Sequence, residues 1–156
     1  MASHEDPTVN DEFVEWTRSK YEDKEIGELK VTRGQYHDYL AMDFDFGTEG
    51  ILKIKMTTYI KKMIEDFEYK SEISGKKATT PAAEHIFEVN DKASKLDKHQ
   101  AEVFHTYVAK ALFASMRARP DILLAVIFLC TRVKNPDEDD WKKLICLMRY
   151  LNTTQD

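Results

Sequence analysis

Two aspartates two residues apart are the first feature of this chain whose spacing could support chemistry. Asp43 and Asp45 lie in the stretch HDYLAMDFDF, residues 37–46, among aromatic and aliphatic side chains. In a β-strand the two carboxylates share one face, as the metal site of a nuclease or polymerase requires. The same alternation is typical of a half-buried strand whose charges face solvent. Because no third ligand accompanies the pair, solvent-facing carboxylates are the favoured interpretation.

The other residue types that bind metals or catalyse reactions are scattered along the chain. Of the five histidines only His99 and His105 share a predicted helix, and their spacing of six does not suit a metal site, which needs three or four. Cys130 and Cys146 form no CxxC pair, so we expect reduced thiols in an intracellular protein of the cytoplasm or nucleus. No phosphate-binding glycine loop, G-x-S-x-G or HExxH motif is present. The sequence therefore predicts no metal, no cofactor and no complete active site.

One region carries positive charge on a chain whose formal net charge is -5. Residues 110–134 include five basic side chains and a single acid, Asp121, which gives this segment a local net charge of 5 − 1 = +4. The five are Lys110, Arg117, Arg119, Arg132 and Lys134. Side chains of this kind at helix ends can contact backbone phosphates. They can equally pair with nearby acids, as Arg119 with Asp121, or complement a helix dipole, as Arg132. Both interpretations stay open.

The periodicity of the N-terminal part, residues 1–56, indicates a helix followed by a small antiparallel sheet. Asp6-Pro7 is typical of a helix start, and we expect a helix from about 7 to 20. Three short strands are expected near 28–33, 37–46 and 50–56.

The C-terminal part, residues 57–156, is predicted to be a helical bundle, so the fold class is α+β. Thr57 or Thr58 is expected to cap the first helix, and residues 69–96 form a long connection. The longest helix starts at Asp97, and a further helix after Pro120 is apolar all round over 122–130, which predicts burial on every side. Asn135-Pro136 is expected to start the last helix.

The longest apolar run has nine residues, too few for a membrane span, so we expect a soluble protein without a membrane partner.

Six segments, in order, resemble the reverse transcriptase of copia-type retrotransposons, over about Ser3 to Thr154. They are YLAM at 39–42, YIKKMIEDF at 59–67, TPAAEH at 80–85, VAKALFASMRARPDI at 108–122, FLCTRV at 128–133, and DDWKKL with MRYLNTT within 139–154. The resemblance is to the part that follows the catalytic Tyr-x-Asp-Asp turn. It implies that the N-terminal helix closes the palm and that the helices from Thr57 onward form the thumb along the template–primer duplex.

The resemblance also implies roles for particular residues. Tyr39, Leu40, Ala41 and Met42 would form the primer grip, and the basic residues of 110–134 would contact nucleic acid. Ala41 stands where the family usually has glycine, and a methyl group there would weaken the grip. The catalytic aspartates would lie before Met1 and the ribonuclease H domain after the YLNTT segment. We therefore expect a non-catalytic fragment, not an enzyme on its own.

Two other functions are compatible with the sequence. The chain could be a protein-interaction module whose acidic helix and apolar faces bind the missing polymerase half or a second copy of itself. A small hydrolase built on His or Asp is the third alternative.

Overall fold

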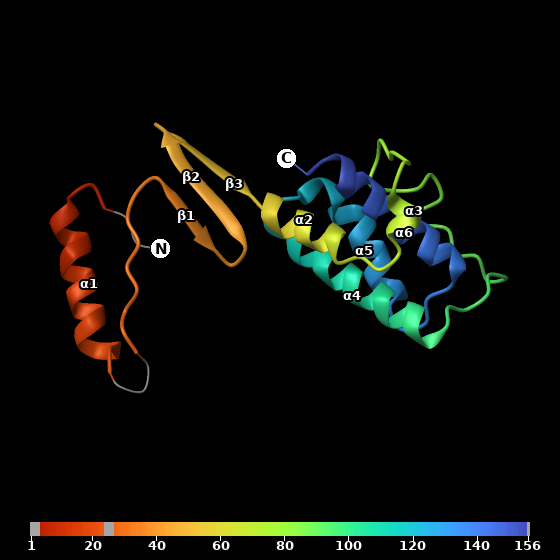
Figure 1. Ribbon diagram of the computed structural model, residues 1–156, viewed down its shortest axis with the longest axis horizontal. Helices are drawn as coiled ribbons and strands as arrows, with labels where there is room; N and C mark the ends of the chain where they lie inside the picture. Colours follow the sequence, from red (N-terminus) through yellow and green to blue (C-terminus); the bar gives the residue numbers. More distant parts are fainter. Residues whose placement is uncertain (1–3, 24–26, 156) are drawn as a thin grey trace.

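The computed structural model describes residues 4–23 and 27–155, which form the predicted α+β fold. Helix α1, Pro7–Tyr21, precedes a three-stranded antiparallel sheet of β1, Tyr36–Tyr39, β2, Met42–Thr48, and β3, Ile51–Lys55, in the order β1-β2-β3. The helices that follow are α2, Thr57–Glu65, α3, Lys70–Ile73, α4, Lys98–Ser115, α5, Leu123–Arg132, and α6, Glu138–Thr153, with a 3-10 turn at Pro120–Ile122. Figure 1 shows an elongated molecule with α1 and the sheet at one end and the helices at the other.

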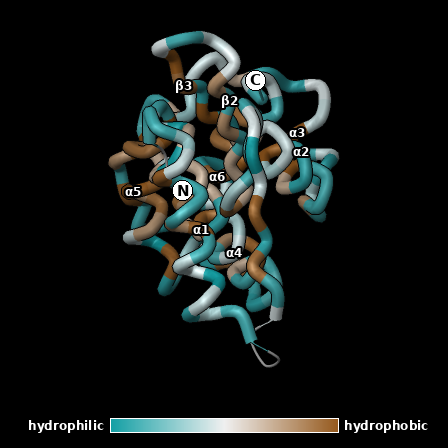
Figure 2. Tube along the Cα trace, turned by 90° about the vertical axis from the view of Figure 1, so that its left-hand side faces the viewer, coloured by the Kyte–Doolittle hydropathy of each residue, from teal (hydrophilic) through white to brown (hydrophobic). Residues whose placement is uncertain are grey.

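The hydrophobic core lies in the helical part. Among the described residues no side chain before Met56 is buried, whereas Phe67, Phe104, Leu129 and Leu144 are fully buried between α2, α4, α5 and α6. Figure 2 shows the contrast in hydropathy between α5, which is hydrophobic over most of its length, and α1, which is mostly hydrophilic. Burial of apolar area is the main source of folding free energy, so the bundle is the stable part of the molecule.

Two predicted helix starts are confirmed. The side chain of Asp6 accepts a hydrogen bond from the backbone N–H of Thr8 at 2.9 Å, and Asp97 accepts one from Gln100 at 2.8 Å. Each carboxylate satisfies a backbone donor that the first turn of a helix leaves without a partner.

Two other predicted starts are wrong. Neither Thr57 nor Thr58 caps α2: the cap position is Met56, which offers no side-chain acceptor. The cap of α6 is Asp137 rather than Asn135, because Asp137 has an extended backbone and forms a reciprocal capping box with Asp140.

The predicted strands need correction at two places. Residues 28–33 form no strand, and the strand predicted over 37–46 is a hairpin, β1 and β2, joined by a turn at Leu40 and Ala41. Both turn residues have positive φ, 52° and 61°, which is the backbone of a two-residue hairpin turn. The third strand, predicted near 50–56, is confirmed as β3.

Complete burial of α5 is the remaining prediction that the structure contradicts. Ala125, Val126 and Leu129 are buried, but Leu124 is 62% and Ile127 52% exposed. The helix packs on α4 and α6 with one face and leaves the other to solvent.

The connection at 69–96 lies along α6. Glu72 accepts hydrogen bonds at one end from the indole of Trp141, at 3.1 Å, and from Arg149 to its backbone carbonyl, at 2.8 Å. At the other end the backbone N–H of Leu96 donates to Pro136 at 3.1 Å. These contacts fix both ends of the connection against the bundle.

Candidate nucleic-acid interface

The turn that carries the predicted primer grip lies where the sheet meets the bundle. Met42 is half-buried against the core cluster, whereas Tyr39 and Leu40 are 59% and 54% exposed. In Figure 1 the β1–β2 turn points toward the start of α2. The turn therefore presents two large side chains to solvent and uses a third, Met42, to contact the bundle.

Ala41 occupies the second position of this turn. Its φ of 61° lies in the left-handed region, where a Cβ is disfavoured and glycine is the usual residue. The glycine that the resemblance places here would suit this backbone. Because Leu40 and Ala41 occupy the turn instead of glycine, the sequence does not indicate a turn at this position.

Tyr59 on α2, Phe113 on α4 and Arg117, which follows α4, form an aromatic and cationic stack. The guanidinium of Arg117 lies 3.6 Å from the ring centre of Phe113, and that ring lies 5.3 Å from Tyr59. Tyr59 donates a hydrogen bond from its hydroxyl to the backbone carbonyl of Lys110 at 3.3 Å. Burial raises the pKa of the Tyr59 hydroxyl, and the charge of Arg117 opposes part of that rise. Arg117 remains exposed, so its charge is available to a ligand.

Arg119 uses its guanidinium group for hydrogen bonds within the chain. It donates two hydrogen bonds to Asp121, at 2.9 and 2.7 Å, and two more to the backbone carbonyl and hydroxyl of Thr154, at 2.6 and 2.8 Å. Its side chain is only 12% exposed, and the Asp121 pair raises its pKa. The structure thus supports the pairing interpretation for this residue, and phosphate contact by Arg119 stays a prediction.

Arg132 is paired in the same way at the far end of α5. Its Nε lies 3.0 Å from both carboxylate oxygens of Asp140, and it also donates to Asp137 at 3.2 Å. Burial alone would raise the pKa of Asp137, but hydrogen bonds from the Asp140 backbone and from Lys95 outweigh it and hold the pKa below its usual value. Arg132 ties α5 to the capping box of α6.

The five predicted basic residues therefore separate into two places. Lys110 lies 4.6 Å over the ring of Tyr107 on α4, and Arg117 follows α4 where the sheet approaches the bundle. Lys134 is exposed and lies beyond α5, beside Arg132, at the opposite end of that helix. One surface cannot include all five.

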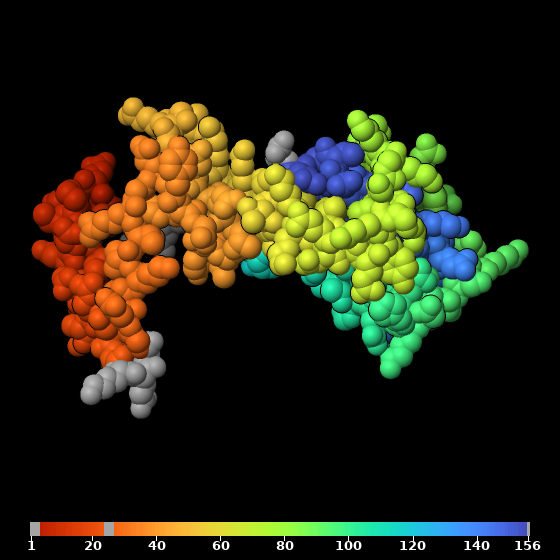
Figure 3. All heavy atoms as spheres, in the orientation of Figure 1, coloured from red at the N-terminus to blue at the C-terminus, as the bar shows by residue number. Residues whose placement is uncertain are grey.

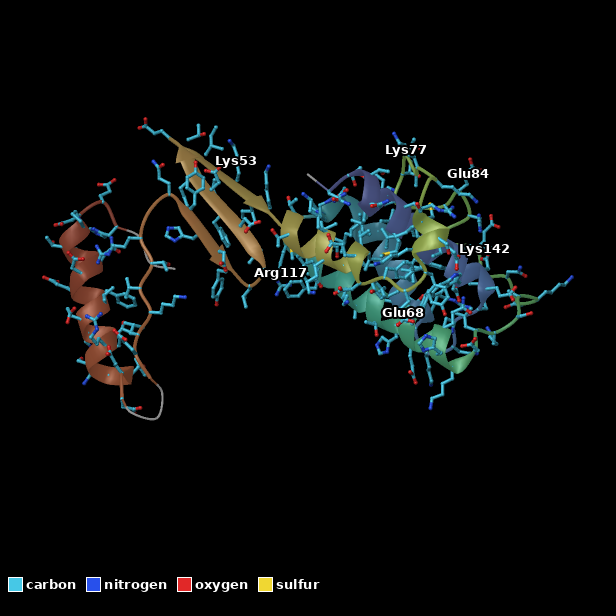
Figure 4. The ribbon with its side chains drawn as sticks, viewed as in Figure 1. Lys53, Glu68, Lys77, Glu84, Arg117 and Lys142 are labelled. Carbon is cyan, nitrogen blue, oxygen red and sulfur yellow. The ribbon has the colours of Figure 1, made fainter. Side chains whose placement is uncertain are left out.

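Two basic residues that the sequence analysis did not single out lie at the same junction. Lys53 and Lys55 on β3 line a hollow of about 280 Å³, together with Thr57, Arg119 and Gln155. Figure 4 shows Lys53 on the sheet and Arg117 where the sheet approaches the bundle. The alternation of Leu52 and Ile54 with the two lysines is the sequence signal that could have found them.

The register of β2 against β3 also explains the surroundings of Asp43 and Asp45. They lie directly opposite Lys55 and Lys53 on the paired strand, so all four side chains share one face of the sheet. Asp45 also accepts a hydrogen bond from the backbone N–H of Gly47 at 2.7 Å. Among the described residues no group of three or more His, Cys, Asp or Glu side chains is placed to hold a metal ion.

Neither cysteine forms a disulfide, and burial raises the pKa of both thiols, Cys130 and Cys146. Within 4–23 and 27–155 no helix combines the length and apolar composition that crossing a bilayer takes.

Comparisons of the chain with protein-family models, with curated proteins and with solved structures find no match.

Proposed function

We propose that this chain is a non-catalytic palm-end and thumb segment of a copia-type reverse transcriptase, which contacts a template–primer duplex where its sheet meets its bundle. The observation that supports this proposal is that exposed Lys53 and Lys55 line a hollow at that junction, and that exposed Arg117 lies where the sheet approaches the bundle. Tyr39 is exposed beside them on the other face of the sheet, where it pairs with Met42. Cations supply the phosphate contacts of a duplex interface, and an aromatic side chain can stack on an unpaired base. An intracellular location, in the cytoplasm or nucleus, belongs to the same proposal.

A salt titration of binding to a primer–template duplex tests the proposal. Each phosphate contact steepens the fall of log affinity with log salt by about one unit. The double variant Lys53→Ala, Lys55→Ala should weaken binding and reduce the slope by about two. The matched control is Lys77→Ala, Lys142→Ala, which removes the same charge from positions on the far part of the bundle. Equal slopes for both double variants would reject the junction as the interface.

Primer extension with Mg²⁺ or Mn²⁺ tests the non-catalytic part. No extension is expected. Asp38 lies opposite Asp43 on β1, but Lys55 and Lys53 lie opposite Asp43 and Asp45 on β3, and no third ligand among the described residues joins these carboxylates to hold a metal ion. Extension that disappears in Asp43→Asn, Asp45→Asn would make the pair catalytic after all.

The alternative function, a protein-interaction module, is supported by a different observation. The apolar face of the sheet includes Phe46, Leu52 and Ile54, which are 37%, 45% and 40% exposed. Sheets of this kind bury one face against another layer, and an uncovered face of this composition is typical of a binding surface. The catalytic half of such a polymerase is the partner we infer for it. If so, Phe46→Asp should abolish binding of a separately expressed catalytic half without changing the unfolding of the bundle.

A further inference from the structure

Helix α1 carries an apolar stripe that nothing in the described structure covers. Val9, Phe13 and Trp16 recur at i, i+4 and i+7, the spacing of anchors on one helix face. They are 40%, 51% and 52% exposed. The opposite side of the helix is the one held to the chain, because Asp11 forms an ion pair with Arg33. The stripe therefore faces away from the molecule.

Helix α5 carries a second uncovered stripe of the same length. Leu124, Ile127 and Thr131 are exposed at i, i+3 and i+7, and the neighbouring Phe128 contacts the exposed ring of Phe87, with ring centres 5.8 Å apart. Seven residues of helix span about 10 Å, so each stripe is about 10 Å long. Two such faces can pack against each other as an ordinary helix pair.

The charged residues that flank the two stripes favour antiparallel over parallel packing of the two helices. Glu5 precedes the α1 stripe by four residues and Lys20 follows it by four; Asp121 precedes the α5 stripe by three and Lys134 follows it by three. Antiparallel packing sets Glu5 against Lys134, an opposite-charge pair, whereas parallel packing would set Lys20 against Lys134, a like-charge pair. The carboxylate of Asp121 is already paired with Arg119 and therefore favours neither direction.

We propose that α1 of one chain packs antiparallel on α5 of a second copy, and that the reciprocal contact forms at the same time. The shape of the molecule favours a second copy over an internal contact, because α1 lies at the opposite end from the bundle (Figures 1 and 3). Two elongated chains lying side by side about a two-fold axis bring both α1–α5 pairs together. This inference is a form of the interaction-module alternative, but it uses helices rather than the sheet face.

Sedimentation equilibrium without nucleic acid tests the proposal. The chain should dimerise, and Ile127→Glu should raise the dissociation constant roughly 30-fold or more, as loss of a central interface residue does. The matched control is Ile51→Glu on β3, because Ile51 and Ile127 are both 52% exposed. A chain that stays monomeric, or a dimer that both substitutions affect equally, overturns the proposal.

Two further measurements test the pairing itself. Phe13→Glu disables α1 and Ile127→Glu disables α5, so an equimolar mixture of these variants should recover one intact contact and associate more tightly than either alone. Glu5→Lys and Lys134→Glu should each weaken the dimer roughly fivefold, and their combination in one chain should restore it. A mixture no tighter than its components, or a combination no better than the single variants, contradicts the antiparallel pairing. None of these substitutions alters Lys53, Lys55 or Phe46, so failure here leaves duplex binding and the sheet-face partner to be judged separately.

Discussion

Replacing Ala41 with glycine should stabilise the β1–β2 hairpin. Ala41 and Leu40 are the two non-glycine residues with positive φ in the described chain, at 61° and 52°. The left-handed backbone costs an L-residue about 1–2 kcal/mol relative to glycine. Glycine loses about 0.5–1 kcal/mol more backbone entropy on ordering. The difference leaves a net gain of about 0.5–1 kcal/mol, a roughly two- to fivefold decrease in the opening equilibrium of the hairpin.

Amide hydrogen exchange measures this opening directly. The backbone N–H of Phe46 donates to Gln35 at 2.8 Å within the hairpin, and its exchange should slow two- to fivefold in Ala41→Gly. Amides in α6 should not change, because the hairpin contributes only the half-buried Met42 to the core cluster.

The opposite substitution in the neighbouring turn is the control. Gly50 joins β2 to β3 with φ of +71°, and a Cβ built there meets no atom within 4 Å. Gly50→Ala therefore adds backbone strain without a steric clash, and should speed exchange in β2 and β3 by a similar factor. If Ala41→Gly speeds exchange, or Gly50→Ala slows it, the assignment of strain to these two turns is wrong.

Two further predictions concern the bundle. Leu144→Ala should lower the free energy of unfolding by about 2–5 kcal/mol in urea denaturation, because Leu144 is fully buried, whereas Trp16→Ala should change it by less than about 0.5 kcal/mol. The Asp137 carboxylate, whose pKa is lowered in the folded state, contributes stability above the unfolded value of 3.8 and loses it as pH falls through the folded value. Asp137→Asn should therefore flatten the fall of the urea midpoint between pH 5 and pH 2 (about one to two units either side of that value); an unchanged slope would assign the acid sensitivity to other carboxylates.

Most of the helical part was predictable because its signals are local. Periodic apolar residues identify α2, α4 and α6, and Asp97 marks the start of α4. The hairpin turn was not predictable, since Leu40-Ala41 has none of the Asn, Asp or Gly residues that such turns usually contain. Tertiary context imposes the turn against the preference of its own residues.

The environment of the basic residues depended on contacts distant in sequence. The Asp121 partner of Arg119 is only two residues away in the sequence, but its Thr154 partner is 35 residues away. Asp140, which binds Arg132, lies across the α5–α6 loop. Charge counting shows where cations are along the chain, but it does not show which of them the fold has already neutralised.

The N-terminal part carries most of the exposed apolar side chains of the described residues. Twelve of the eighteen exposed large hydrophobic residues among the described positions precede Met56, although that part holds none of the buried ones. A helix and a three-stranded sheet without a buried face gain little free energy from folding, so their amides should exchange far faster than those of the bundle. A partner that covers the sheet, the α1 stripe or the junction would raise this local stability in proportion to its binding. Protection that rises in α1 on dimerisation, or in the hairpin on duplex binding, would show which surface each partner covers.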